Sequence, residues 1–346
     1  MKIACFDLEG PLSPQDNAYE VAGEMDKGRQ FFEKISKYDD YLAEEGRHGH
    51  EPGDTLALIA PFLLIEEVGE RDIKRVSCRA KIVSGAKELI DNLKDNGWEV
   101  YVISTSYQQH AYNISQKLDI KRENVYSTQL KLEELKKGLT QSLIDKLKRF
   151  KQKILKKEFS KELIDYMDRF FFDELPETEW GDPLNRINVR GGEDKVEAVK
   201  KIANSHNIDL SEVTVIGDSI TDYKMLKKIR EKSGKSIVFN GNKYAIPHAG
   251  YSAASLDIRI IEPIIRSKNT NNIVKEWEKN QEEIFKDIQT IPQSFKKYGV
   301  AKLFKNNSKN PIINYIPDKT EKEIEKIIEK HKFYRNNVRG EAAKLG

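Results

Sequence analysis

The sequence predicts an α/β protein built on a doubly wound parallel sheet of the Rossmann-like kind, with helices on both faces. Two observations lead to this class. Short apolar runs typical of buried parallel strands alternate with stretches of helical periodicity. Several of these runs end directly at an acidic or hydroxyl residue, as is typical where parallel strands open onto a ligand site.

The expected strands are short and are separated by amphipathic helices. The helix before the second strand has Leu89, Ile90 and Leu93 on one face and ends at Gly97, a residue type common after helix C-termini. The five expected strands are residues 3–6, 98–103, 124–128, 213–216 and 236–239.

Three longer stretches interrupt this alternation, and their apolar residues recur at helical spacing. We therefore expect a catalytic core with three additions. The core comprises residues 1–12, 83–130 and 185–263, and the additions are a helical unit at 13–82 between the first two strands, an antiparallel helical hairpin inserted at 131–184 and a lysine-rich helical C-terminal extension at 264–346.

The composition excludes several classes of protein. Of 346 residues, 38% are hydrophobic and 33% are charged, yet the formal net charge is only +3, which gives no electrostatic case for binding nucleic acid. Two cysteines make neither a disulfide framework nor a four-ligand zinc site. The few cysteines favour a cytoplasmic protein, and because no apolar run reaches the length of a bilayer span we expect no membrane insertion.

Asp7 and Glu9 stand at the exit of the first expected strand. Because side chains alternate along a strand, two acids one residue apart point the same way. A carboxylate can attack an anionic phosphoester only when a cation neutralises the charge, and oxygen ligands suit Mg²⁺. The pair therefore predicts a magnesium site in which Asp7 is the nucleophile.

Three further sites follow in the chain. Ser104 ends the second strand, where a hydroxyl and free backbone N–H groups can bind phosphate oxygens. Lys195, at the start of a helix, can offset the charge of the phosphate and the nucleophile. Asp218 follows the fourth strand and can complete the metal site, with Asp222 positioned to fix Asp218 or Lys195.

Each of these features also has an ordinary structural explanation. Hydroxyl residues favour loop starts, acidic pairs are common in a charged protein, and a single lysine on a helix is usually solvated. All four features nevertheless occur in one chain, three at the ends of expected strands and one at a helix start. Their joint occurrence favours a catalytic site.

The four features resemble the four motifs of the haloacid dehalogenase (HAD) superfamily, in the same order. Residues 3–10 and 217–226 are most similar to the branch of phosphoserine phosphatases and phosphoserine:homoserine phosphotransferases. Most phosphatases of the superfamily have Asp where Glu9 stands, but the phosphotransferase type and the enolase-phosphatases have Glu. Pro11 is a larger departure, because Thr or Val is usual there.

The resemblance implies phosphoryl transfer from a small phosphorylated metabolite, in two steps with Mg²⁺. Asp7 would take up the phosphoryl group, while Glu9 would protonate the leaving oxygen and then activate water or an acceptor alcohol. Ser104 and Lys195 would stabilise the equatorial oxygens. The remaining residues expected to contact the substrate near the strand ends are Thr105, Ser106 and Asn240.

The unit at 13–82 corresponds to the cap of this branch, to which we assign substrate choice. Asp16 matches the position at which phosphoserine phosphatases place an acid that meets the substrate's amine. Arg47, in the loop 47–50, offers a cation to a carboxylate or a second phosphate. The alternatives are that Asp16 caps a helix starting near Asn17 and that the loop is merely mobile.

Over its full length the chain also resembles a methanogen family described as subunit R of energy-converting hydrogenase A. The alternative function is therefore a non-catalytic or regulatory subunit associated with such a complex. The helical insertion and the C-terminal extension would then offer surfaces to a protein partner.

Overall fold

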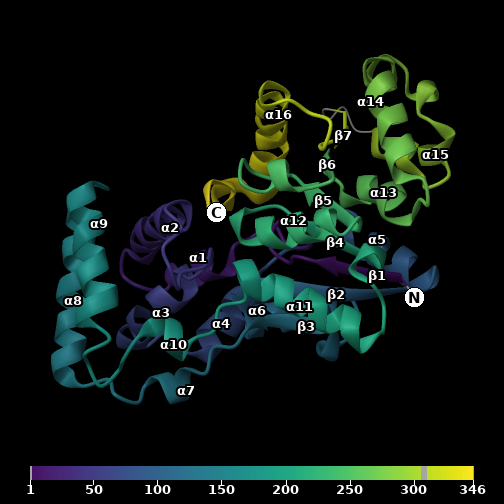
Figure 1. Cartoon of the computed structure of the whole chain (residues 1–346). Helices are drawn as coiled ribbons and strands as arrows, with labels where there is room; N and C mark the ends of the chain where they lie inside the picture. The colour runs from purple at the N-terminus through teal and green to yellow at the C-terminus, as the bar shows by residue number, and fades with distance from the viewer. Residues whose placement is uncertain (1, 305–309, 346) are drawn as a thin grey trace.

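The computed structural model describes residues 2–304 and 310–345. Residues 1, 305–309 and 346, which belong to the expected core and C-terminal extension, lie outside this part. Figure 1 shows two lobes, with the sheet and its helices on the right and the cap helices on the left. The C-terminal end of the chain lies between them.

A seven-stranded sheet forms the centre of the larger lobe, in the order β3-β2-β1-β4-β5-β6-β7. Neighbouring strands are parallel except for β7, which is antiparallel to β6. The strands are β1 (Lys2–Phe6), β2 (Trp98–Tyr107), β3 (Val125–Thr128), β4 (Val213–Gly217), β5 (Lys235–Phe239), β6 (Tyr251–Ala254) and β7 (Ile312–Tyr315). The predicted fold class is confirmed. Strands β6 and β7 were not expected, and β7 lies in a stretch for which the sequence predicted only helix.

Helices cover both faces of the sheet, because successive side chains of each strand point to opposite sides. Ile3 and Cys5 pack with α11 (Gly192–Ser205) and α12 (Tyr223–Glu231). Ala4 and Phe6 pack on the other face. The helices of that face are α5 (Ala86–Asp95), α6 (Gln108–Lys117), α13 (Glu262–Arg266) and α14 (Thr270–Lys286). The central strands are therefore buried on both sides, as parallel strands require.

The cap lobe is built from two segments of the chain that share one hydrophobic core. Phe62 lies with its ring centroid 4.6 Å from that of Phe31 and 5.7 Å from that of Phe150, which belongs to the inserted hairpin. The helices of this lobe are α1 (Asn17–Ala22), α2 (Gly28–Glu44), α3 (Thr55–Ile65), α4 (Glu70–Cys78), α7 (Leu132–Leu135), α8 (Gln141–Lys156), α9 (Lys161–Asp168) and α10 (Pro183–Arg186). The insertion thus stabilises the cap directly.

The C-terminal region crosses back over the sheet and ends at the cap. After α15 (Gln293–Lys296) and β7, α16 (Glu321–Arg339) begins at a capping box between Thr320 and Glu323. Beyond α16, Lys344 forms an ion pair of 2.7 Å with Glu33 on α2. Within the described ranges, no helix combines the length and apolar character needed to span a bilayer.

Candidate active site

The first two site residues are placed by β1. Asp7 follows its last residue, and its backbone N–H still donates to the carbonyl of Ile216 on β4 (2.8 Å), so its position is fixed by the sheet. The chain then turns sharply at Gly10, where φ is +113° and an added Cβ would lie 2.4 Å from Cγ of Asp218. Only glycine fits this conformation and this close approach.

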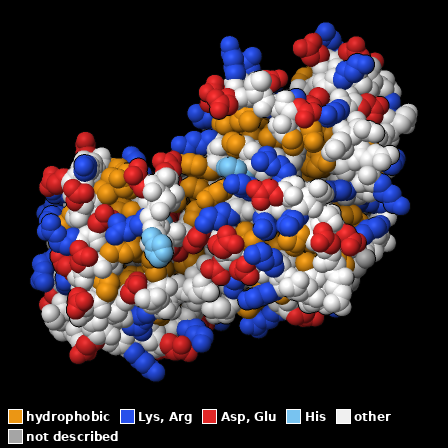
Figure 2. Space-filling model, viewed as in Figure 1, with side chains coloured by type: hydrophobic (Ala, Val, Ile, Leu, Met, Phe, Trp, Pro, Cys, Tyr) orange, Lys and Arg blue, Asp and Glu red, His pale blue; other side chains and the backbone are white. Residues whose placement is uncertain are grey.

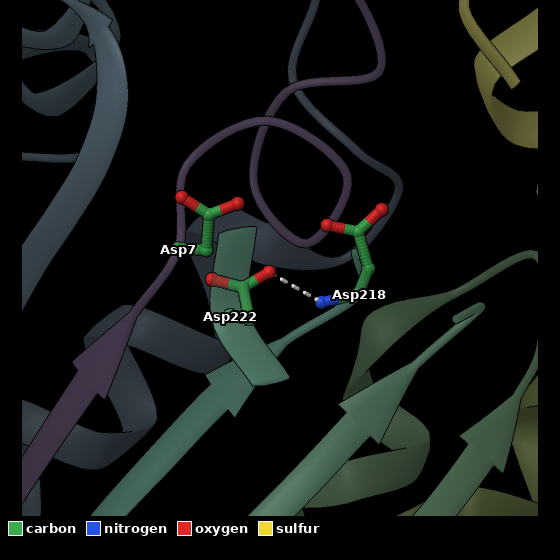
Figure 3. Close-up of side chains that lie close together, drawn as sticks. All are labelled: Asp7, Asp218 and Asp222. Carbon is green, nitrogen blue, oxygen red and sulfur yellow. Dashed lines mark hydrogen bonds between the residues drawn. The ribbon is translucent and has the colours of Figure 1, made fainter. Parts of the chain in front are cut away.

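The loop after β4 carries Asp218 and Asp222, both without solvent exposure. One carboxylate oxygen of Asp222 accepts from the backbone N–H groups of Asp218 (2.9 Å) and Ser219 (3.1 Å). Figure 3 shows the carboxylates of Asp7 and Asp218 at the ends of β1 and β4, with Asp222 between them. Residues 211 positions apart in the chain therefore meet because their strands are neighbours in the sheet.

Lys195 on α11 contacts two of these acids and is completely buried. Its ammonium group donates to Asp7 (2.9 Å), Asp222 (2.7 Å) and the hydroxyl of Thr221 (3.2 Å). Burial disfavours its charge, but Asp222 and Asp7 outweigh that effect and raise the pKa of Lys195. Burial and the charge of Asp222 also raise the pKa of Asp7 to about 7, although Lys195 acts in the opposite direction.

The carboxylates of Asp7, Asp218 and Asp222 offer the oxygen ligands that a hard divalent cation binds. Ligand oxygens of Asp7, Asp218 and Asp222 lie within 4.8 Å of one another. Asp222 is already engaged by Lys195 and two backbone N–H groups, whereas Oδ1 of Asp218 is buried and has no hydrogen-bond partner among the described residues. The set thus fits a hard divalent cation held by Asp7 and Asp218 and supported by Asp222.

Glu9 and Asp16 lie on the side of the site that faces the cap. Glu9 accepts a hydrogen bond from the backbone N–H of Asn17 (2.8 Å) and lies 3.7 Å from His110. Burial lowers the pKa of His110 to about 3, so this histidine is neutral. Burial, with the charge of Asp16, raises the pKa of Glu9 well above its usual value. Glu9 is therefore suited to hold a proton and donate it.

Asp16 caps a helix and also lines the candidate pocket, while its expected contact with the substrate stays a prediction. Its carboxylate caps α1 by accepting from the backbone N–H of Tyr19 (2.8 Å). It also lines a pocket that contains Asp7, Glu9, Thr105 and residues of the cap. Figure 2 shows the surface hollowed between the cap lobe and the rest of the molecule, with acidic and basic side chains interspersed around it.

The three hydroxyl residues in the last part of β2 are not equivalent. Thr105 lines the pocket and donates to the carbonyl of Arg190 (3.2 Å). Ser104 and Ser106 are buried and bonded to each other through their hydroxyl groups (2.8 Å). The register of β2 against β3 shifts between Ser104 and Tyr107, so the strand end is irregular at this point. A polar strand end of this kind offers donors to an anion.

Comparison with known proteins identifies the family of this chain. The model of the haloacid dehalogenase-like hydrolase family matches residues 80–255. The chain belongs to this family. Its expected place among the phosphoserine phosphatase-like HAD proteins is confirmed by a curated relative from Archaeoglobus fulgidus, named phosphoserine phosphatase, which is 26% identical over 244 residues. That match covers 70% of this chain but 53% of the relative, so the chain spans about half of the relative's length.

Solved structures give the same fold. A gene product from Archaeoglobus fulgidus is similar over 100% of this chain and 99% of its own, with a TM-score of 0.79 and 26% sequence identity. A substrate-bound phosphoserine phosphatase matches 75% of this HAD chain and 96% of its own chain, with a TM-score of 0.50 and 19% identity. The former similarity includes the C-terminal extension, whereas the family match ends before it.

Two residues expected to bind substrate lie elsewhere. Arg47 forms an ion pair of 3.0 Å with Asp168, and its guanidinium lies 3.9 Å above the ring centroid of Phe172, so it joins the cap to the inserted hairpin and does not line the pocket. Asn240 donates to the carbonyl of Ser255 (2.8 Å) and accepts from its N–H (2.9 Å). The geometry gives both side chains a role in joining segments, in place of the substrate contact expected from the sequence.

Two site residues of this HAD chain were missed in the sequence. Arg335 and Arg339, both on α16, donate to the same carboxylate oxygen of Asp218, in the case of Arg339 at 2.9 Å. Their only sequence signal is a spacing of four residues that continues from Ile327 and His331, which together make the buried face of α16. Without the docked position of α16, this stripe does not reveal what it contacts.

Proposed function

We propose that the protein is a Mg²⁺-dependent phosphatase or phosphotransferase that acts on a small phosphorylated metabolite through an aspartyl-phosphate on Asp7. The observation that carries this proposal is the buried group at the ends of β1 and β4. It combines a carboxylate nucleophile, the ammonium group of Lys195, and a buried oxygen of Asp218 without a partner among the described residues. Phosphoryl transfer requires a nucleophile, a fixed positive charge and an oxygen atom that can bind a divalent metal ion.

Asp7 and Asp218 would hold the metal, with Glu9 contributing through its backbone carbonyl or its carboxylate. When bound, Mg²⁺ supplies charge neutralisation at the phosphoryl oxygens. Lys195 adds a second positive charge. Its three hydrogen bonds, to Asp7, Asp222 and Thr221, hold its ammonium group in place before the substrate binds. Such preorganised charge stabilises the transition state without reorganisation.

In the first step, a carboxylate oxygen of Asp7 attacks phosphorus and the bond from phosphorus to the leaving oxygen breaks. Glu9 gives its proton to that leaving oxygen, which departs as an alcohol. The raised pKa of Glu9 supports this assignment, because a buried carboxyl with Asp16 nearby keeps its proton more readily than an exposed one.

In the second step, the carboxylate of Glu9 takes a proton from water. The resulting hydroxide attacks phosphorus, the bond to Asp7 breaks, and inorganic phosphate is released. If an acceptor alcohol takes the place of water, the same two steps transfer the phosphoryl group. Hydrolysis and transfer therefore use the same residues and differ in what enters the pocket. The expected association with a hydrogenase complex stays a prediction.

A screen of phosphorylated metabolites against the full chain tests this proposal. Phosphate release is measured with Mg²⁺ and after its removal with a chelator, in parallel with p-nitrophenyl phosphate as a generic substrate. We expect metal-dependent release from at least one compound. Release from none of them, with a protein that is folded and binds metal, would favour the non-catalytic subunit.

A further inference from the structure

We infer that Arg339, on the C-terminal helix α16, is a specificity-determining residue that binds an anionic group in the part of the substrate beyond the phosphoryl group. This inference rests on the proposed function and assigns to the tail a recognition role that the sequence assigned to Arg47 in the cap. Arg339 lies outside the matched family region, in the segment that reaches between the two lobes (Figure 1).

Arg339 lines the catalytic pocket together with Asp7, Glu9, Asp16 and Leu345. Its side chain is only 5% exposed, so its charge is largely withdrawn from water. A guanidinium has five N–H donors. Among the described residues its one hydrogen bond runs from Nη1 to Asp218, and its Nε is buried without a partner. A buried cation with unused donors at a pocket wall is suited to an anionic ligand.

Arg339 donates to Asp218 (2.9 Å) and also lines the pocket together with Glu9, Asp16 and residues of the cap. Burial disfavours its charge, but acidic neighbours outweigh this and raise the pKa of Arg339, in the order Asp218, Asp16, Glu9 and Asp7. Since the phosphoryl group is assigned to Asp7 and Lys195, the group that reaches Arg339 belongs to the remainder of the substrate.

The acids around Arg339 do not already satisfy its donors. The carboxylate of Asp16 accepts from the N–H of Tyr19, and that of Glu9 accepts from the N–H of Asn17. Asp39, on the cap wall of the same pocket, accepts from Gly53 (2.9 Å) and Thr55 (2.8 Å) and pairs with His50 (2.7 Å). These acids are held by their own partners, which leaves the guanidinium for a ligand.

Arg335 holds the end of α16, which carries Arg339, in place. It donates from Nε to the carbonyl of Ala343 (3.0 Å) and from Nη2 to that of Leu345 (3.0 Å), while Nη1 contacts Asp218. All three of its nitrogens are thus used in joining the end of the chain to the loop after β4. The two arginines therefore differ in role. Arg335 positions the end of α16, and Arg339 is available to bind the anionic group of the substrate.

Two phosphonates that are not hydrolysed test this inference by calorimetry with Mg²⁺ present. Phosphonoacetate carries a carboxylate beside its phosphonate, and ethylphosphonate has a methyl group in its place. We expect the wild-type protein to bind phosphonoacetate about tenfold or more tightly than ethylphosphonate. Arg339→Gln should lose most of this preference, and Arg339→Lys should retain part of it. The matched control is Lys332→Gln on the exposed face of α16, which should keep the full preference.

The outcomes separate this inference from the proposed function. An unchanged preference in Arg339→Gln, or an equal loss of both ligands, would overturn the specificity role, the second result by assigning Arg339 to the phosphoryl group or the metal site. Equal binding of the two ligands by the wild type would overturn it as well. If the wild-type protein binds neither phosphonate with Mg²⁺, the proposed function fails and the inference fails with it.

Discussion

Arg335 and Asp218 are 117 residues apart in the chain, yet the guanidinium of Arg335 donates to both the carboxylate and the backbone carbonyl of Asp218, the latter at 3.2 Å. The ion pair is almost completely buried, with side-chain exposures of 4% and 0%. The C-terminal helix is therefore fastened to the loop that carries the proposed metal ligand.

Removing this guanidinium should destabilise the protein strongly. Arg335→Met leaves Asp218 with one arginine and frees the carbonyl groups of Ala343 and Leu345, so we expect a loss of about 3 kcal/mol in the free energy of unfolding. Urea denaturation measures the loss. Lys332→Met, which removes an exposed charge from the same helix, should cost less than about 0.5 kcal/mol. Equal effects of the two changes would show that the buried pair contributes no stability.

The two aspartates after β4 should differ in their effect on metal binding. Asp218→Asn removes a direct ligand charge, and we expect it to weaken Mn²⁺ binding more than Asp222→Asn, for which a loss of about tenfold is typical of a supporting residue. Electron paramagnetic resonance of free Mn²⁺ gives both affinities. Both variants should also lower the melting temperature, because Asp222 holds Lys195 and two backbone N–H groups and Asp218 holds two buried arginines. The reverse order of metal affinities would exchange their roles.

The cap should lose stability as pH rises, because the buried residues His50 and Asp54 lose protons that the folded protein binds tightly. Burial and the charge of Asp39 raise the pKa of Asp54 to about 7. A bond to Asp39 outweighs the effect of burial and raises the pKa of His50. Both residues hold protons more tightly in the folded than in the unfolded protein, so their contribution to stability is greatest at low pH and falls as pH rises from about 4 to about 8.

Asp54→Asn isolates this effect, because asparagine stays neutral at every pH. Relative to the wild type, this variant should gain about 1–3 kcal/mol of stability between about pH 5 and about pH 8. Thermal unfolding of the two proteins across that range provides the comparison. A stability difference that does not vary with pH would mean that Asp54 has its ordinary pKa in the folded protein.

Asp16 should affect substrates unequally, since it lines the pocket on the cap side and also caps α1. With a substrate found by the metabolite screen, Asp16→Ala should lower kcat/KM by about tenfold more than it does for p-nitrophenyl phosphate. Asp16→Asn, which can still accept from Tyr19, separates the two roles. Equal losses for both substrates would leave only the helix-capping role, worth about 1 kcal/mol of stability.

The strands that support the site could be predicted because each is an apolar run followed by an acid or hydroxyl. The sequences of β1, the start of α11 and the loop after β4 indicated Asp7, Lys195 and Asp218 by their order and by their places at strand ends and a helix start. The fold then brings them together. In contrast, β6 has the short sequence Tyr-Ser-Ala-Ala, and β7 is a four-residue strand that follows a long helical stretch of the sequence. Neither has a periodicity that local reasoning can separate from a loop.

The arginines of α16 could not be predicted for a different reason. Their burial depends on where a whole helix docks, and that position is set by contacts distant in sequence. His331 accepts from the N–H of Gly241 (3.1 Å) and contacts the hydroxyl of Ser252 (3.2 Å), which brings the end of α16 over the strand ends. Conversely, the loop around Arg47 suggested a substrate contact, but a neighbouring acid and aromatic ring of the inserted hairpin occupy that side chain.

The central claim, that Asp7 takes up the phosphoryl group, is tested most directly by trapping the intermediate. The protein is quenched during turnover of p-nitrophenyl phosphate with Mg²⁺, and borohydride reduces any acyl phosphate to the corresponding alcohol. Mass spectrometry of the N-terminal peptide should then find homoserine in place of Asp7, and neither the product nor turnover should appear in Asp7→Asn checked for deamidation. Turnover without reduction at Asp7, or an Asp7→Asn variant with the wild-type rate, would contradict the account.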